Sequence, residues 1–222
     1  MKISMEMAMK VTNPVSVALF LLLIFFLGCG DLGLNRTIQV GDGEKRTQDL
    51  NSVNGAILIG RQCEILGNCR TVNGGIEIGE SSTVHDLMAV NGSISIAENA
   101  RIIGDVTTVN GSIECESGVV VKDEVSTING DINLNRTRVE YDVKTINGDV
   151  LLRNKTVVNG DVVIRARRGF STENPAIHIT IQDSSIVEGN IINRDEKRTV
   201  KVILARGGQV KGKIQKAEVV QE

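Results

Sequence analysis

Apolar residues recur along this chain at fixed distances from a repeated Asn-Gly pair. A valine or isoleucine precedes each asparagine, an isoleucine or valine follows three positions after it, and a further residue, aliphatic in all but one case, comes two positions later. Two more apolar columns complete each full unit, with Glu, Ser, Arg, Asn and Lys between the columns. A spacing of two between apolar positions is the periodicity of a β-strand. Each unit therefore predicts three short strands, each with one apolar face.

The repeat length is nearly constant over most of the chain. The first five steps between Asn-Gly pairs are 19, 18, 19, 19 and 18 residues, and the sixth is 12. The pairs begin at Asn54, Asn73, Asn91, Asn110, Asn129, Asn147 and Asn159. One unit cannot bury its apolar faces alone, but stacked units bury them in a shared interior. The pattern predicts an all-β fold, a single-stranded parallel β-helix, which is a three-sided β-solenoid with about 18–19 residues per coil.

A stack of antiparallel hairpins is the alternative fold, since Asn-Gly also marks two-residue hairpin turns. It is disfavoured, because a meander would not keep the same three-column lap in every unit. The composition agrees with a β-solenoid. Aromatic residues make up 2% of the chain, so the core must consist of Ile, Val and Leu, and β-branched residues suit strands.

The Asn-Gly pairs are expected to form the corners between strands. Glycine accepts positive φ without a steric penalty, and asparagine tolerates the left-handed region better than most residues. Asparagines stacked in register can also hydrogen-bond to one another along the axis. All seven asparagines of the repeat are therefore predicted to form one structural ladder.

The chain is predicted to divide into four parts. These are a signal peptide over 1–28, a tether and N-terminal cap over 29–53, the regular solenoid over 54–164, and irregular C-terminal coils with a cap over 165–222. Residues 29–164 hold 12 basic and 19 acidic residues, a net charge of −7, whereas 165–222 hold 11 and 7, a net charge of +4. This asymmetry favours head-to-tail contact between copies or contact with an anionic envelope polymer. The alternative is an ordinary solvated surface.

The N-terminal segment has the pattern of an export signal. Residues 15–28 are apolar apart from Ser16, which is short for a membrane-spanning helix of about 20 residues and typical of a secretory signal. The segment ends in Phe26-Leu27-Gly28-Cys29, which resembles the lipobox of bacterial lipoproteins at Gly28 and Cys29 and departs from it at the two preceding positions. The resemblance implies lipidation of Cys29, and Gly30 after it favours the outer membrane, facing the periplasm or the cell surface. An uncleaved anchor helix is the alternative.

The repeat itself resembles a known family. The rhythm V-N-G-[SD]-I-x-I, ended by GGQVKGKI at 207–214, is similar to the bactofilin-like polymer-forming proteins and to related adhesin-type repeats over about residues 53–216. The resemblance implies a right-handed, three-sided β-helix that polymerises through its ends. The export signal and the long C-terminal part depart from bactofilins, most of which are cytoplasmic.

Catalytic chemistry is not indicated. The two histidines, His85 beside Asp86 and His178 in a strand-like segment, are expected to be surface and strand residues. Neither G-x-S-x-G, H-E-x-x-H nor a phosphate-binding loop occurs, and the hexapeptide rhythm of β-helical acyltransferases is absent. With one Tyr and one Phe beyond the N-terminal apolar segment, stacking on bases or sugars is disfavoured. No enzyme activity, cofactor, metal or nucleic-acid partner is expected.

The cysteines leave two alternatives open. Export permits a disulfide between Cys63 and Cys69, and the alternative is a pair of buried thiols. Cys115 stands in an apolar column and is expected to be a buried thiol.

The expected function is structural. The sequence indicates a membrane-anchored lipoprotein of the cell envelope that acts as a scaffold or spacer and can self-associate by end-to-end stacking. The alternative is an adhesin or binding module for an envelope polymer or a protein partner.

Overall fold

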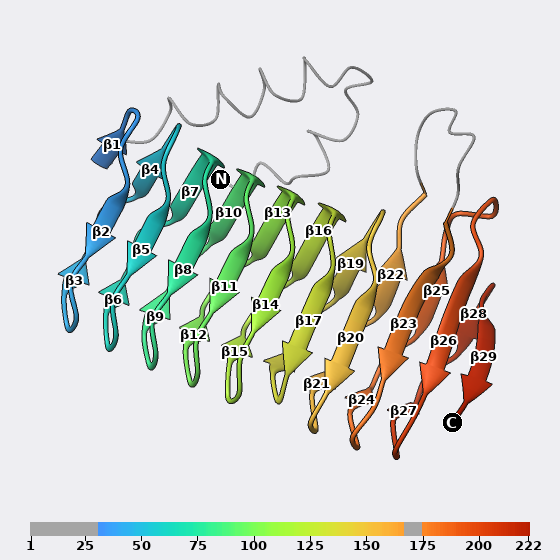
Figure 1. Cartoon of the computed structure of the whole chain (residues 1–222). Coiled ribbons are helices and arrows are strands. Elements are labelled where there is room, and N and C mark those ends of the chain that lie inside the picture. The colour runs from blue at the N-terminus through green and yellow to red at the C-terminus, as the bar shows by residue number, and fades with distance from the viewer. Residues whose placement is uncertain (1–30, 167–174) are drawn as a thin grey trace.

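The fold is a three-sided parallel β-helix of nine full coils and part of a tenth. The computed structural model describes residues 31–166 and 175–222. Figure 1 shows successive coils stacked side by side from β1 at one end to β29 at the other. Ten rungs spaced by about 4.8 Å make a rod about 43 Å long. The predicted all-β solenoid is thus confirmed, and no helix long and apolar enough to cross a membrane occurs in the described residues.

Sheet A contains the first strand of every coil. Its strands, in stacking order, are β1 (Asp31–Gly33), β4 (Leu50–Ser52), β7 (Cys69–Asn73), β10 (Leu87–Asn91), β13 (Val106–Asn110), β16 (Val125–Asn129), β19 (Val143–Thr145), β22 (Val162–Ile164), β25 (Ile191–Asn193) and β28 (Ile214–Gln215).

Sheet B contains the second strand of every coil. Its strands are β2 (Ile38–Val40), β5 (Ile57–Ile59), β8 (Ile76–Ile78), β11 (Ile94–Ile96), β14 (Ile113–Cys115), β17 (Ile132–Asn135), β20 (Val150–Arg153), β23 (Ile177–Ile181), β26 (Val200–Leu204) and β29 (Glu218–Gln221).

Sheet C contains the third and shortest strand of each full coil. Its strands are β3 (Lys45–Arg46), β6 (Glu64–Ile65), β9 (Thr83–Val84), β12 (Arg101–Ile102), β15 (Val120–Val121), β18 (Arg138–Val139), β21 (Val157–Val158), β24 (Ile186–Val187) and β27 (Gln209–Val210). We number the coils by their sheet A strand, so that coil 6 is β16–β18 and coil 7 is β19–β21, and we name the corners A–B, B–C and C–A.

In-register pairing builds the core. Ile76 pairs with Ile94, and Ile94 pairs with Ile113, so each apolar column repeats at the spacing of the coils. Within a strand the burial alternates, as in β8, where Ile76 and Ile78 are buried and Glu77 between them is exposed. The interior is a continuous aliphatic column, and the only described aromatic side chain, Tyr141, is 60% exposed. Aliphatic burial across the coils is therefore the main stabilising term.

The solenoid begins earlier than predicted. Ile38 pairs with Ile57 and Val40 with Ile59, so the described part of segment 29–53, from residue 31, is a full coil and the start of the next. The prediction of a tether there was wrong. Coil 1 was missed because its corner reads Asn35-Arg36 and lacks the glycine of the repeat.

The C-terminal coils are irregular because of longer corners. From Val162 to its partner Ile191 the step is 29 residues, and from Ile191 to Ile214 it is 23. The extra residues lie at the A–B corner, between β22 and β23 and between β25 and β26. The strands nevertheless stay in register as far as β29, all four residues of which are exposed. These coils therefore extend the rod as far as β29.

Candidate functional site

Two features of the corners are candidates for function: a ladder of asparagines and a polar hollow. The ladder runs along the A–B corner, where the side-chain amide of each asparagine donates to the side-chain oxygen of the asparagine one coil earlier. The six Nδ2–Oδ1 distances lie between 2.6 and 2.9 Å. The members are Asn35, Asn54, Asn73, Asn91, Asn110, Asn129 and Asn147.

The ladder differs from the predicted one at both ends. Asn35 is a member that the sequence reading missed. Asn159 is not a member, because the 12-residue step places it at the C–A corner after β21, where its Nδ2 donates to Oε2 of Glu140. The same dipeptide thus occupies two different corners.

The glycines of the repeat are required for close approach and not for positive φ. A Cβ on Gly74 would lie 2.3 Å from the carbonyl oxygen of Gly55, and one on Gly111 would lie 2.2 Å from that of Gly92. Among the corner glycines after Asn54 to Asn147, Gly130 alone has a φ in the positive range. The reason that the sequence suggested for Asn-Gly was wrong, since stacked backbones leave no room for a side chain at this position.

Buried threonine hydroxyl groups hydrogen-bond to backbone carbonyls of the A–B corner from the core side. Oγ1 of Thr71 donates to the carbonyl of Gly55 at 2.9 Å, and Oγ1 of Thr108 donates to that of Gly92 at 2.9 Å. Both threonines are fully buried. The sequence signal that could have found them is a Thr two residues before Asn in several units.

The C–A corner carries a second series of contacts, made by carboxylates. Asp86 Oδ1 accepts from the backbone N–H of Asp105 at 3.1 Å, and Asp105 Oδ1 accepts from that of Glu124 at 3.1 Å. Partial desolvation raises the pKa of Asp105, and the neighbouring carboxylates Asp123, Asp86 and Glu124 add to it, although the hydrogen bond from Glu124 opposes the rise. The corner therefore concentrates negative charge.

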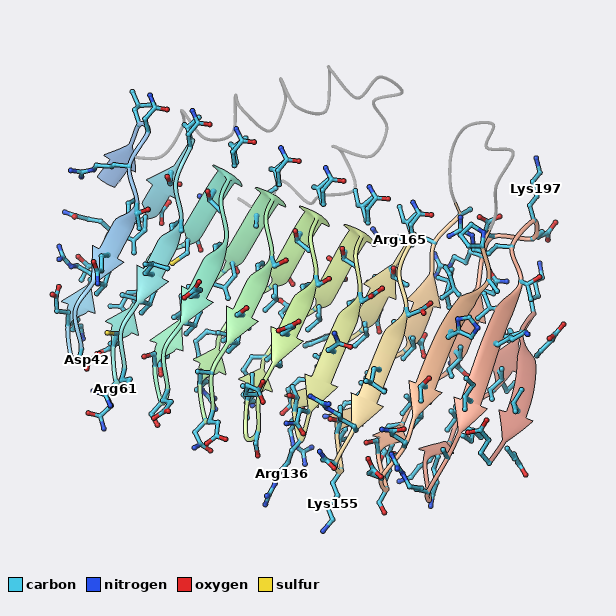
Figure 2. All side chains as sticks on the ribbon, in the orientation of Figure 1. Asp42, Arg61, Arg136, Lys155, Arg165 and Lys197 are labelled. Carbon is cyan, nitrogen blue, oxygen red and sulfur yellow. The ribbon has the colours of Figure 1, made fainter. Side chains whose placement is uncertain are left out.

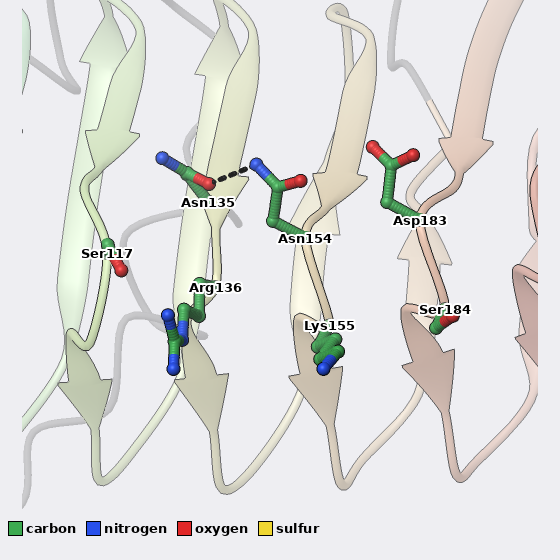
Figure 3. A pocket seen from close by; sticks show the side chains of 7 residues that line it. All are labelled: Ser117, Asn135, Arg136, Asn154, Lys155, Asp183 and Ser184. Atoms are coloured by element: carbon green, nitrogen blue, oxygen red, sulfur yellow. Dashed lines mark hydrogen bonds between the residues drawn. The ribbon is translucent and has the colours of Figure 1, made fainter.

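The hollow lies on the B–C corner, across coils 5 to 8. It encloses about 510 Å³ and is lined by Ser117, Asn135, Arg136, Asn154, Lys155, Asp183 and Ser184. Figure 3 shows these side chains on four successive coils, with Asn154 donating to Asn135 at 2.8 Å. The exposed side chains of Arg136 and Lys155 project from this edge of the rod (Figure 2). The sequence reading missed the hollow, although the spacing of 19 between its two cations equals one coil.

The described cysteines form no disulfide. Cys63, Cys69 and Cys115 are buried free thiols. Cys63 precedes a sheet C strand and directs its Sγ at the carbonyl oxygen of Gly41, 3.0 Å away, whereas Cys69 opens a sheet A strand. The alternative of a Cys63–Cys69 disulfide was thus wrong, because Cys63 lies next to a strand of sheet C and Cys69 lies in a strand of sheet A. Burial raises the pKa of Cys69 and of Cys115 to about 12, so neither is a nucleophile at neutral pH. Cys29 lies outside the described residues.

Each of the two histidines lies beside an aspartate at the surface. His85 Nδ1 lies 3.3 Å from Asp86 Oδ1 at the C–A corner, and His178 Nδ1 lies 3.4 Å from Asp149 Oδ2 on sheet B. His85 Nδ1 also lies 3.1 Å from the side-chain amide of Asn68. In residues 31–166 and 175–222, no group of three or more His, Cys, Asp or Glu side chains could hold a metal ion.

No protein-family model matches the sequence, and the searches of curated proteins and of solved structures found no match either. The arguments about function therefore depend on the residues and their geometry.

Proposed function

We propose that the protein is a lipoprotein of the cell envelope, attached to a membrane through lipidated Cys29, whose β-solenoid acts as a structural scaffold or spacer. The observation that carries the proposal is the continuity of the rod. Three parallel sheets run through the described residues in register, with a hydrogen-bonded ladder at the A–B corner. A rod of this kind holds two attachment points at a fixed distance, which is what a spacer requires.

Self-association by end-to-end stacking is part of this proposal. The last described strands of the three sheets are β28, β29 and β27, and Val219 and Val220 in β29 are 47% and 39% exposed. Unpaired strand edges can accept the edge of another copy. Opposite net charge on the two parts of the chain would favour head-to-tail contact.

The anchor and the scaffold are tested separately. For the anchor, wild type and Cys29→Ser are compared by membrane fractionation and by mass spectrometry of the N-terminus. A lipid on Cys29 in wild type, together with release of the variant, supports it. An unmodified, uncleaved N-terminus overturns it.

For the scaffold, electron microscopy and light scattering of the purified protein are expected to show filaments whose length grows with concentration. A monodisperse monomer at all concentrations would overturn self-association, and the proposal would then be limited to a monomeric spacer.

A binding module is the second candidate function. It is favoured by the hollow at the B–C corner, whose two exposed cations lack a carboxylate partner among the described residues. Attachment of an envelope polymer there would make the rod a connector between that polymer and the membrane.

A further inference from the structure

We propose that the hollow at the B–C corner of coils 6 and 7 is a binding site for an acidic glycan, whose carboxylate, sulfate or phosphate groups are held by Arg136 and Lys155. This inference names a ligand class for the second candidate function. It depends neither on the membrane anchor nor on self-association.

The first argument is the lack of ion pairs. At the same corner, Arg61 pairs with Asp42 at 2.8 Å and Arg206 pairs with Asp183 at 2.7 Å. Within the described ranges, no carboxylate lies within ion-pair distance of Arg136 or Lys155. Asp183, the one carboxylate of the lining, is paired with Arg206, and Glu116 of coil 5 accepts from Asn135 at 3.2 Å. Arg136 and Lys155 are therefore the charged groups of the lining that remain available to an anion.

A second argument is a local reversal of charge. The B–C corners of coils 3, 4 and 5 carry Glu80, Glu98 and Glu116 on the acidic part of the chain. Coils 6 and 7 instead carry four cations in this corner or in the strands that flank it, none of which forms a salt bridge to a described residue. They are Arg136, Arg138, Arg153 and Lys155.

Arg153 adds a buried donor beside the hollow. It ends β20, and its residue pairs with Asn135, one of the lining residues. Its Nε is buried and makes no hydrogen bond to a described residue. Arg153 therefore keeps its positive charge next to the hollow, where it adds to the charge of Arg136 and Lys155.

The third argument is shape. Strand pairing of Val120 with Arg138 and of Arg138 with Val157 places Arg136 and Lys155 in one column, next to Gly118 on one side and Ser184 on the other. Because both neighbours are short, the two long cationic side chains have open space beside them. Apart from Asp183, which is paired with Arg206, the rest of the lining is amide and hydroxyl groups, which suit the hydroxyls of a sugar. They belong to Ser117, Asn135, Asn154 and Ser184.

Nucleic acid and lipid bilayer fit this site less well. The lining has no aromatic side chain on which a base could stack. It also has no aliphatic side chain that could enter a bilayer, and it lies along a narrow edge of the rod (Figure 2).

The test measures binding of the full chain, in a neutral detergent, to immobilised heparin and polygalacturonate, with neutral dextran as the reference. Wild type is expected to bind both acidic glycans, to lose affinity as salt is raised, and to ignore dextran. The variant Arg136→Gln/Lys155→Gln is expected to bind at least about tenfold more weakly. The matched control, Lys45→Gln/Arg61→Gln, removes two cations that are already ion-paired in coils 1 and 2, and should change affinity by less than about twofold.

A third variant separates binding from folding. Lys155 has φ of 65°, a left-handed conformation that glycine adopts without strain. Lys155→Gly should therefore unfold at the same or a higher temperature than wild type and still lose affinity for the glycans. The proposed site would be overturned if the control variant lost as much affinity for the acidic glycans as the hollow variant. It would also be overturned if wild type bound dextran as tightly as it binds the acidic glycans. Tighter binding to phosphatidylglycerol vesicles or duplex DNA than to both glycans would overturn the ligand class.

Discussion

Arg198 donates from Nη1 to Oδ1 of Asn147, the last ladder asparagine among the described residues, at 2.7 Å. The same nitrogen donates to the backbone carbonyl of Ile146 at 2.8 Å. The two residues are 51 positions apart, because the guanidinium comes from the corner of coil 9 and reaches coil 7. A buried cation thus donates to the ladder oxygen of Asn147 and ties the irregular coils to the regular ones.

We expect Arg198→Lys to loosen the C-terminal coils without unfolding the rod. Lysine keeps the charge, but its shorter side chain and tetrahedral ammonium do not place a donor where Nη1 of Arg198 lies, and a lost hydrogen bond to a charged group costs about 1.5–3 kcal/mol. Hydrogen exchange followed by mass spectrometry should show faster exchange in β25 and β26, with β7 to β16 unchanged. Arg194→Lys is the control, since Arg194 is an exposed residue of the same corner. Uniform acceleration along the whole rod would contradict this local role.

The ladder itself is expected to stabilise the fold. Asn110 donates to Asn91 and accepts from Asn129, so Asn110→Ala removes two hydrogen bonds and should lower the free energy of unfolding by about 1–2 kcal/mol. Asn159→Ala is the matched control, because it changes an Asn-Gly pair that lies outside the ladder, and it should cost less than about 0.5 kcal/mol. Urea denaturation monitored by circular dichroism measures both. If both variants lost the same free energy of unfolding, the hydrogen bonds between the stacked amides would add nothing measurable to stability.

Adjacent glycines are expected to differ sharply in their tolerance of alanine. A Cβ on Gly74 would lie 2.3 Å from the carbonyl oxygen of Gly55, whereas one on Gly75 would have Ser93 O as its nearest neighbour, at 3.1 Å. Gly74→Ala therefore forces two coils apart and should cost about 3 kcal/mol or more.

Gly75→Ala should stay within about 1 kcal/mol of wild type, since alanine also restricts the unfolded chain. Thermal unfolding of the two variants checks this. A similar loss in both would show that the coils can separate locally, and that close approach is not the reason for glycine at position 74.

The sequence predicted what repeats in register and missed what depends on which corner a residue occupies. The apolar columns were visible because stacking places one aliphatic residue above another, as in Ile76, Ile94 and Ile113. Asn159 was misplaced because its local sequence is the same as that of the ladder residues. Asn35 was missed because Arg36 follows it in place of glycine.

Apolar character alone also did not distinguish side chains of the core from side chains on the outer face. Val72 and Val109 precede ladder asparagines in an apolar column, yet they are half-buried on the outer face, while Thr71 and Thr108 before them are fully buried. The inward threonines are explained by their hydrogen bonds to glycine carbonyls of the preceding coil. The hollow was missed for a similar reason, since Arg136 and Lys155 become neighbours only through the stacking of coils.

The carboxylates of the C–A corner predict a dependence of stability on pH. Desolvation and the charges of Asp123, Asp86 and Glu124 raise the pKa of Asp105 above its ordinary value of 3.8. In the folded protein this carboxyl therefore holds its proton to a higher pH than in the unfolded chain. By linkage, ionisation of Asp105 lowers the free energy of unfolding as pH rises above 3.8.

Asp105→Asn should consequently raise the unfolding temperature at pH 7, because the amide oxygen can still accept from the N–H of Glu124 while the charge is removed. The advantage should shrink as pH falls and vanish below 3.8, where both forms are neutral. Differential scanning calorimetry of both proteins from pH 3 to pH 8 measures the crossover. Asp42→Asn is the comparison, since ion pairing with Arg61 lowers the pKa of Asp42, so that this variant should lose stability at pH 7. A gain of stability in Asp42→Asn, or a loss in Asp105→Asn, would mean that hydrogen bonding and not charge governs these corners.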